Sequence, residues 1–272
     1  MRVWHQSFTV LEDLPDYVHL LDEHVKHVTR PGTEVVLHGM RPGTYPSNYP
    51  GDHIRFSYLQ RRHTQQFIDA AIQAEAEAYD AFYISTIPDV GFEDIRTLVD
   101  IPVVALGQAS LLVAATLARR VGIINFIDAL RPQLRRNAEL YGLGGLLGPV
   151  LPLGLSFNDL LAGYEAPALV IDTFRSVARR AIDDGAEVII PGEVPLNVFL
   201  AHHQVSEVDG IPVLDSFAAG LKMCELRVDL ARCSNLRPVR GAGLYHDRPA
   251  PELVSAVHDF YRTRSDVEHA DQ

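Results

Sequence analysis

Two stretches of this chain share one plan, and this repeat constrains the fold more than any other feature. Residues 80–105 read DAFYISTIPDVGFEDIRTLVDIPVVA, and residues 186–215 read AEVIIPGEVPLNVFLAHHQVSEVDGIPVLD. In each copy an apolar run (82–84 and 188–190) leads into a polar turn with a proline, then into a helix-compatible segment and an Ile-Pro-Val strand. Short β-branched runs without polar alternation are typical of parallel strands that helices cover on both faces. The sequence therefore predicts an α/β fold.

Thr86 and Glu193 occupy the same place in the two copies, just past the C-terminal end of a strand. Open α/β sheets bind ligands at that edge. We therefore expect two pseudo-symmetric parallel-sheet α/β domains with the active site in the cleft between them, and both side chains lining that cleft.

The internal resemblance extends to the first strand of each half. The segment ARRVGIINF (118–126) is similar to the N-terminal MRVWHQS, and Ser7 aligns with Asn125. We expect residues 1–105 together with 216–272 to form the first domain, and residues 106–215 to form the second.

The net charge of the chain limits the kinds of partner that it can bind. With 24 Lys and Arg against 35 Asp and Glu, the net charge is −11. Binding to nucleic-acid phosphates needs a surplus of basic side chains on some face, so we expect a small-molecule partner and no nucleic acid.

The start MRVWHQSFTVLEDLP lacks the apolar core of a signal peptide, and the uncharged stretch 140–158 is too short and too rich in Gly and Pro to cross a membrane. We expect a cytoplasmic protein without a membrane partner, and a homo-oligomer.

The positions at the expected strand ends are rich in hydroxyl, amide and carboxylate side chains and include two glycines. These positions are Gln6, Ser7, Thr86, Asp89, Gly107, Gln108, Asn125, Gly192, Glu193 and Asp215. They include no Arg, so we expect small donors near Ser7, Thr86 and Asn125 to bind an anionic group. No glycine-rich phosphate loop, HExxH motif or cysteine-rich zinc spacing occurs, and we expect no metal site.

A loop rich in Gly, Pro and Tyr, HGMRPGTYPSNYPGDH (38–53), follows the second expected strand. Long loops in compact domains often act as lids over a site. Tyr45, Tyr49, His53 and Arg55 are candidates for closing over a substrate, and the alternative is that they pack the loop onto the surface. Tyr49 is the candidate that we assign to substrate binding.

The sequence resembles the Asp/Glu/hydantoin racemase superfamily, in particular its hydantoin-racemase-like branch. The likeness lies in MRVWHQS, RPGTEVVLHG, YDAFYISTIPDVGFEDIRTLVDIPVVALGQAS, DDGAEVIIPGE and IPVLDSFAAGLK, in that order. The resemblance implies two pseudo-symmetric α/β domains and cofactor-independent proton transfer at a carbon next to a carboxylate or carbonyl. In the racemases of that superfamily two cysteines, one in each half, remove and return the proton.

The positions of those cysteines read Thr86 and Glu193 here, and the two cysteines of this chain, Cys224 and Cys233, lie elsewhere. A thiol reaches its reactive thiolate with modest tuning, whereas a threonine hydroxyl needs a strong partner. Glu193 is the candidate acid or base, and the alternative is that it caps the turn that follows it. Thr86 is a candidate donor to a substrate oxygen.

Asp89, close behind Thr86, has three candidate roles. It can activate Thr86, orient a water molecule, or cap a helix over residues 90–98, and capping is the interpretation we favour. With Gln6, Ser7, Gln108, Asn125 and Tyr49 it completes the candidate substrate-binding set.

These residues leave three functions open. The leading hypothesis is a one-base isomerase, decarboxylase or related lyase that acts on a small carboxylate or cyclic amide, with Glu193 moving the proton. A second is an amide or lactam hydrolase in which Glu193 activates water. The third is a non-catalytic small-molecule binding protein.

Overall fold

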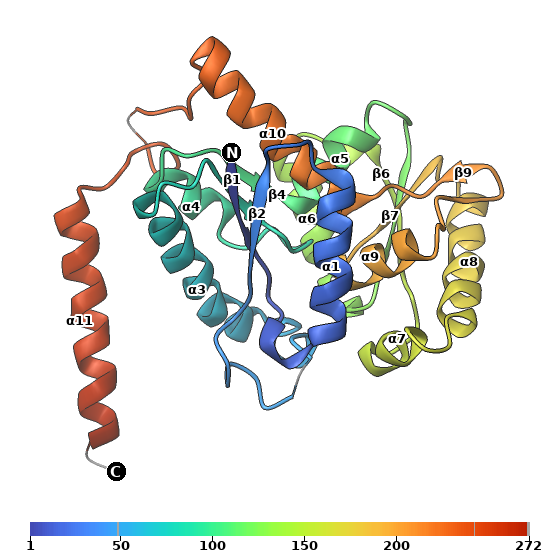
Figure 1. The fold of residues 1–272 in the computed structure, drawn as a ribbon, viewed down its shortest axis with the longest axis horizontal. Helices are drawn as coiled ribbons and strands as arrows, with labels where there is room; N and C mark the ends of the chain where they lie inside the picture. Colours follow the sequence, from blue (N-terminus) through green and yellow to red (C-terminus); the bar gives the residue numbers. More distant parts are fainter. Residues whose placement is uncertain (48, 242, 271–272) are drawn as a thin grey trace.

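The chain folds around two parallel sheets, one in each half of the sequence. The computed structural model describes residues 1–47, 49–241 and 243–270, with side chains described through residue 261. The first sheet has the order β2-β1-β3-β4 and the second the order β6-β5-β7. The two sheets lie side by side with helices around them (Figure 1). The predicted α/β fold with parallel strands is confirmed.

The elements of the first half follow one another as alternating strands and helices. They are β1 (Arg2–Gln6), α1 (Pro15–Val28), β2 (Glu34–His38), α2 (Gly51–Ile54), α3 (Ser57–Ala76), β3 (Ala81–Ile84), α4 (Phe92–Leu98), β4 (Val103–Ala105) and α5 (Leu106–Ala114). The central strand β3 is buried at all four residues, which explains its unbroken apolar sequence AFYI.

The second half repeats this plan with one strand fewer in its main sheet. Its elements are β5 (Val121–Asn125), α6 (Arg131–Leu140), β6 (Leu147–Pro152), α7 (Phe157–Gly163), α8 (Ala168–Asp183), β7 (Val188–Pro191), α9 (Val194–His202), and the short antiparallel pair β8 (Glu207–Val208) and β9 (Ile211–Pro212). The second Ile-Pro-Val segment forms only this short β9 and one parallel bridge, between Ile189 and Val213. The structural repeat is therefore weaker at its end than the sequence repeat predicts.

Helix α10 (Ser216–Ser234) packs against the first sheet although it follows the second half in sequence. The Tyr83 hydroxyl on β3 donates a hydrogen bond of 3.4 Å to the carbonyl oxygen of Phe217. A Cβ placed on Gly220 would lie 2.1 Å from that hydroxyl oxygen, so only glycine permits this approach. The chain therefore returns from the second half to the first, where helix α10 packs against the first sheet.

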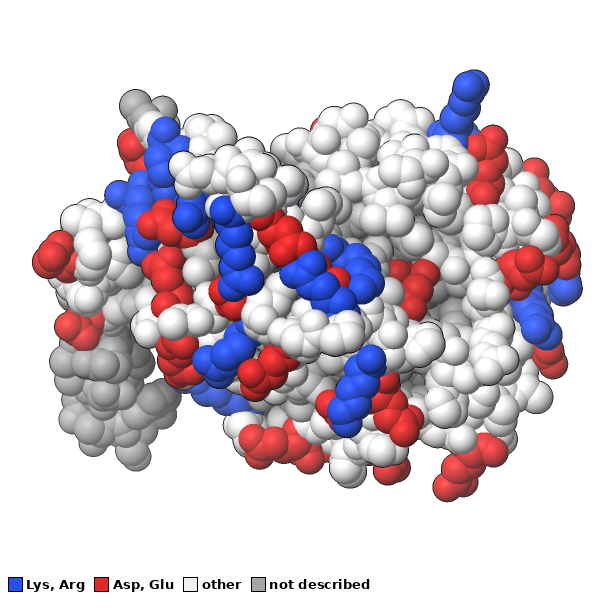
Figure 2. Space-filling model, turned by 45° about the horizontal axis from the view of Figure 1, so that its top comes forward, with Lys and Arg blue, Asp and Glu red and all other residues white. Residues whose placement is uncertain are grey.

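Acidic and basic side chains alternate on much of the surface. On the face drawn in Figure 2 they intermingle most densely on the side that carries α11, and a broad area beside it holds few charges. In the described part of the chain, no helix is both long and apolar enough to span a bilayer.

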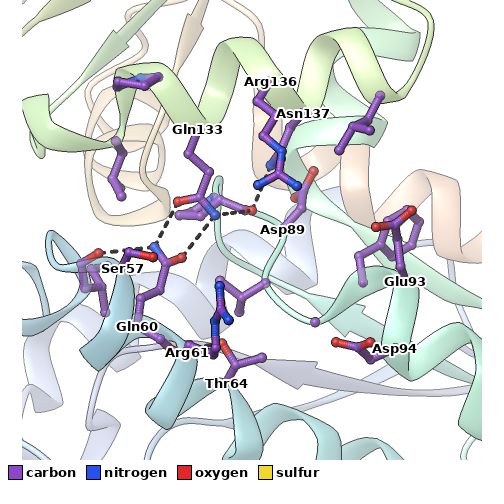
Figure 3. Close-up of a pocket in the computed structure, with 18 of the residues that line it drawn as sticks. Ser57, Gln60, Arg61, Thr64, Asp89, Glu93, Asp94, Gln133, Arg136 and Asn137 are labelled. Carbon is purple, nitrogen blue, oxygen red and sulfur yellow. Dashed lines mark hydrogen bonds between the residues drawn. The ribbon is translucent and has the colours of Figure 1, made fainter.

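One contact between the two halves joins helix α6 of the second half to the loop 85–91 of the first, and another joins helix α1 to helix α9. Asn137 Nδ2 donates a hydrogen bond of 2.8 Å to the Pro88 carbonyl, and Gln133 Nε2 donates to the same oxygen at 3.4 Å. Gln133 also pairs with Gln60 of α3 at 3.0 Å. These amide contacts, drawn in Figure 3, fix the loop that follows β3 against the other half.

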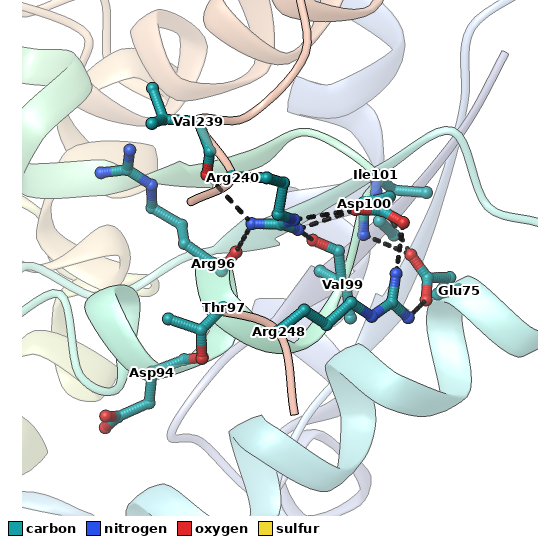
Figure 4. A network of polar contacts seen from close by, with 10 residues as sticks. All are labelled: Glu75, Asp94, Arg96, Thr97, Val99, Asp100, Ile101, Val239, Arg240 and Arg248. Carbon is teal, nitrogen blue, oxygen red and sulfur yellow. Dashed lines mark hydrogen bonds and ion pairs between the residues drawn. The ribbon is translucent and has the colours of Figure 1, made fainter. Parts of the chain in front are cut away.

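The segment between α10 and α11 (Pro251–Ala270) is held to the first half by two arginines (Figure 4). Arg240 donates to the Val99 carbonyl at 2.6 Å and to Asp100 Oδ1 at 2.8 Å. Arg248 pairs with Glu75 at 2.5 Å and also with Asp100. Helix α11 itself stands apart from the sheets (Figure 1), and its side chains from 251 to 261 are exposed except for the partly buried Val254.

Candidate functional site

A small pocket of about 50 Å³ opens where the carboxyl ends of the central strands of the two sheets meet. It is lined by Ser7, Phe8, Thr9, Tyr49, Pro50, Ile54, Ser85, Thr86, Ile87, Phe126, Ile127, Phe157, Glu193, Val194 and Pro195. Thr86 and Glu193 therefore line one pocket, one from each half, as the repeat predicts. No Arg or Lys lines it, in agreement with the expectation that small donors form the polar wall.

Glu193 lies between β7 and α9, and its side chain reaches the loop that follows the neighbouring strand β5. Its Oε2 accepts a hydrogen bond of 2.9 Å from the Phe126 N–H, and its Oε1 accepts one of 3.2 Å from the Ile127 N–H. It makes no side-chain cap to its own helix, although it is the N-cap residue of α9. The alternative that Glu193 caps the turn after it is therefore wrong, because its oxygens serve the loop after β5.

The surroundings of Glu193 favour its neutral form. Desolvation raises the pKa of the carboxyl from 4.5 to about 7, and the backbone N–H donors at Phe126 and Ile127 limit the rise because they stabilise the anion. A carboxyl with this pKa is present in both protonation states at neutral pH. That property is the one that a general acid or base requires.

Asn125 shapes the loop that holds Glu193 and does not line the pocket. The residue is fully buried, and its Nδ2 donates a hydrogen bond of 2.7 Å to the Ile127 carbonyl. The expected contact of Asn125 with substrate is therefore replaced by a positioning contact, which turns the N–H groups of residues 126 and 127 toward the carboxylate.

Thr86 follows β3 and is 9% exposed. Its carbonyl accepts a hydrogen bond of 3.1 Å from the Asp89 N–H, which tightens the loop. Since Asn137 and Gln133 hold Pro88 in the same loop, the second half fixes the position of Thr86 from outside the pocket. Its hydroxyl lies among the polar lining groups, where it can serve as a donor.

Asp89 turns away from the pocket and binds another helix. It has a left-handed backbone, with φ of +51°, a conformation that Asp and Asn adopt more readily than most residues. Its carboxylate accepts hydrogen bonds from Gly107 N–H at 2.7 Å, Gln108 N–H at 2.9 Å and the Tyr141 hydroxyl at 2.7 Å. The predicted cap of a helix over 90–98 is wrong, because α4 begins at Phe92 with Gly91 as its N-cap, and Asp89 caps α5 instead.

The carboxyl of Asp89 is also perturbed. Desolvation raises its pKa to about 7, against the opposing effect of the Tyr141 hydroxyl and the N–H groups of Gly107 and Gln108. The hydrogen-bond partners of its carboxylate lie outside the pocket, directly after α6 and at the start of α5, so neither the activation of Thr86 nor the orientation of a water molecule there finds support in the contacts of its side chain.

Three further predicted residues divide between the pocket and other places. Ser7 lines the pocket, and its Oγ accepts a hydrogen bond of 3.1 Å from the Thr9 N–H. Gln6 is 2% exposed and is engaged by Trp4 and Gly39, so it does not reach the pocket. Gln108 lies on the other side of the 85–91 loop, in a separate groove. The expectations for Gln6 and Gln108 are therefore wrong, because both side chains follow the backbone away from the pocket.

The loop after β2 contributes one aromatic wall. Tyr49 stacks on Phe157 of α7, with ring centroids 5.1 Å apart and planes 16° from parallel, and both rings line the pocket. Burial, followed by the negative charge of Glu193, raises the pKa of Tyr49, so its hydroxyl stays protonated. Tyr45 and His53 instead pack against each other and His63.

Several lining residues had no signal in the sequence. Phe157 comes from a helix that the repeat does not contain, and Phe126 and Ile127 act through backbone N–H groups that no side-chain motif reveals. The alignment of Asn125 with Ser7 could have pointed to residues 126–127, since each of the two aligned residues stands at the junction of a strand and the loop that follows it. Cys224 is buried in α10 and Cys233 is exposed, and neither lines the pocket. Among the described residues, no group of three or more His, Cys, Asp or Glu is placed to hold a metal ion.

Comparison with known proteins agrees with this architecture. The hydantoin racemase of Pseudomonas sp. (strain NS671) is 28% identical over 200 residues, which cover 73% of this chain and 76% of that protein. Among solved structures, allantoin racemase from Klebsiella pneumoniae has a TM-score of 0.73 at 20% identity and covers 92% of this chain and 95% of its own. Allantoin racemase from Pseudomonas fluorescens has a TM-score of 0.71 at 22% identity, with 92% and 98% covered. The sequence profile of the Asp/Glu/Hydantoin racemase family matches residues 16–224, and this chain belongs to that family.

Proposed function

We propose that this protein is a cofactor-independent isomerase that moves a proton at a carbon next to a carboxylate or carbonyl group, with Glu193 as the base. The observation that carries the proposal is the position of the Glu193 carboxyl on the pocket wall with a pKa of about 7. A base works best when its pKa lies near the working pH, because it is then ionised and still a competent proton acceptor.

The pocket supplies partners for the charge that proton removal creates. When a proton leaves such a carbon, negative charge moves to the adjacent carbonyl oxygen, and preorganised donors stabilise it. The hydroxyls of Ser7, Thr9 and Thr86 line the wall where that oxygen can lie. Thr86 is a donor in this proposal and not a second base, since its hydroxyl has no basic partner among its described contacts.

The substrate class follows from the pocket and the relatives. A small carboxylate or a cyclic amide offers both an acidic carbon and an adjacent carbonyl oxygen. Hydantoin racemases and allantoin racemases, which are similar to this chain in sequence or in fold, favour the cyclic amide. With about 50 Å³ of free volume, the pocket admits a ring only if lining side chains move, and the stacked rings of Tyr49 and Phe157 are candidates for that movement.

Isotope exchange tests the proposal. A 5-alkylhydantoin incubated with the protein in D₂O should gain deuterium at the ring carbon between the carbonyl and nitrogen. Glu193→Gln keeps size and polarity but removes the titrating group, so exchange should fall by the roughly 10²–10⁴-fold typical of a lost general base. The control is Cys224→Ser with Cys233→Ser, which should exchange at nearly the wild-type rate because neither cysteine reaches the pocket.

Two results would contradict the assignment. A folded double serine variant without activity, beside a normal Glu193→Gln variant, would remove Glu193 from the reaction. Entry of ¹⁸O from water into a ring-opened carboxylate, without deuterium at carbon, would favour the second candidate, an amide or lactam hydrolase in which Glu193 activates water.

A further inference from the structure

A second and much larger cavity, of about 880 Å³, lies on the far side of the 85–91 loop from the catalytic pocket. Its walls come from α3 and α4 of the first half and α6 of the second (Figure 3). Asp89 and Gln108, which the pocket leaves unused, face it. We call this cavity the arginine groove, after Arg55, Arg61, Arg96 and Arg136, which line it.

The lining of the groove has a small excess of positive charge, whereas the whole chain has a net charge of −11. Four arginines line it against three carboxylates, Asp89, Glu93 and Asp94. Both oxygens of Asp89 are already occupied by N–H donors and the Tyr141 hydroxyl. Its remaining acidic side chains, Glu93 and Asp94, are exposed and come from the first turn of α4.

The four arginines of the groove differ in their contacts with described residues: Arg55 and Arg96 lie beside aromatic rings, whereas Arg61 and Arg136 have no partner. The guanidinium of Arg55 lies 5.5 Å from the ring centre of Phe56, and that of Arg96 lies 5.2 Å from that of Phe92. Arg61 and Arg136, in contrast, form no side-chain hydrogen bond, ion pair or ring contact with any residue that the structure describes. They approach the groove from opposite walls, Arg61 from α3 and Arg136 from α6 (Figure 3).

Between these arginines the wall is already fixed by amide groups. Gln60 and Gln133 pair at 3.0 Å across the two halves, and Asn137 holds the Pro88 carbonyl at 2.8 Å. The helices that carry Arg61 and Arg136 are therefore held at a set separation before any ligand binds. Preorganisation of this kind lowers the entropic cost of binding.

We propose that the arginine groove binds a small anion with two phosphate or carboxylate groups, held between Arg61 and Arg136. Guanidinium groups bind both kinds of oxyanion through paired N–H donors, and a ligand with an acidic group at each end satisfies both walls. Such a ligand joins α3 to α6 across the groove. The inference does not depend on the reaction proposed for the pocket.

Calorimetric titration tests it, with inorganic pyrophosphate and succinate as probes for the two kinds of acid. Arg61→Gln with Arg136→Gln should weaken binding about 100-fold, or about tenfold for each charged hydrogen-bond partner lost. The matched control is Arg62→Gln with Arg135→Gln, which removes the same charge from the adjacent, exposed positions of the same helices, outside the groove. The control should bind like the wild type, and thermal unfolding should show that both double variants are folded.

Three results would overturn the proposal. Equal weakening in the two double variants would show that only general charge attracts the anion. Binding that disappears in Thr86→Val and persists without Arg61 and Arg136 would place the anion in the smaller pocket beside Glu193. Failure of the wild-type protein to bind either probe would show that the groove is no anion site. If only one probe binds with the expected arginine dependence, the groove prefers that acid.

Discussion

Replacing Glu193 by Gln should change how the stability of the protein depends on pH, even when no substrate is present. The folded protein raises the pKa of this carboxyl from 4.5 to about 7, mainly by desolvation. Between these two pH values the unfolded chain releases the proton while the folded protein retains it. Rising pH therefore favours unfolding of the wild type, and the Gln variant lacks this effect.

The size of the effect follows from the two pKa values. A difference of about 2.5 pH units at about 1.36 kcal/mol each corresponds to about 3 kcal/mol. Stability from this group is fully present below pH 4.5, declines as the pH rises toward 7, and stays lost above it. Gln offers one acceptor oxygen in place of two, so Phe126 or Ile127 loses a partner, at a cost of about 1–3 kcal/mol that does not vary with pH.

Urea unfolding between pH 4.5 and pH 8.5 measures this prediction. The free energy of unfolding of Glu193→Gln minus that of the wild type should rise by about 3 kcal/mol across the range. Asp89 titrates in the same window but is present in both proteins, so its contribution cancels in the difference. For the exposed Glu165, replacement by Gln should give a difference constant to about 0.5 kcal/mol. A constant difference for Glu193→Gln would refute the claim that the fold raises its pKa.

Two other substitutions test contacts on which the site depends. Tyr141→Phe removes the hydroxyl that donates to Asp89, and it should cost about 1–3 kcal/mol above pH 7, where the carboxylate is ionised, and less at pH 5, as urea unfolding at the two pH values will show. Gly220→Ala places a methyl group against the buried tyrosine of β3, so its melting temperature should fall well below that of Gly241→Ala, where the added carbon meets open space; equal melting temperatures would show that α10 shifts without cost.

Sequence reasoning succeeded where a side chain's role follows from the strand that precedes it. Thr86 and Glu193 could be paired because each follows an apolar run, and the carboxyl ends of parallel strands meet at one edge of a sheet. The same reasoning failed for Gln6 and Gln108. A position at a strand end does not fix the side of the loop to which a side chain turns, and for Gln6 that choice depends on contacts with Trp4 on the same strand and with the distant Gly39.

Backbone donors and the other half of the chain account for most of what the sequence could not reveal. Asn137 and Gln133 donate hydrogen bonds to the Pro88 carbonyl, which lies 45 to 49 positions earlier in the chain. Amide side chains on a helix surface follow no sequence pattern from which such a partner could be predicted. The left-handed turn at Asp89 was equally hidden, since Asp before a helix is most often its N-cap.

The two perturbed carboxyls show why one is the candidate base and the other is not. Asp89 and Glu193 each follow a buried parallel strand, each accept hydrogen bonds from two successive backbone N–H groups, and each have a pKa raised to about 7 by desolvation. Asp89 accepts a third hydrogen bond, from Tyr141, and turns away from the pocket that Glu193 lines. Glu193 has no third donor from a described side chain, and it lines that pocket. A carboxylate can accept about four hydrogen bonds, so Glu193 keeps a lone pair that faces the pocket and can take a substrate proton. A raised pKa alone would not distinguish the two residues, whereas their positions do, because Glu193 lines the pocket and the carboxylate of Asp89 binds groups outside it.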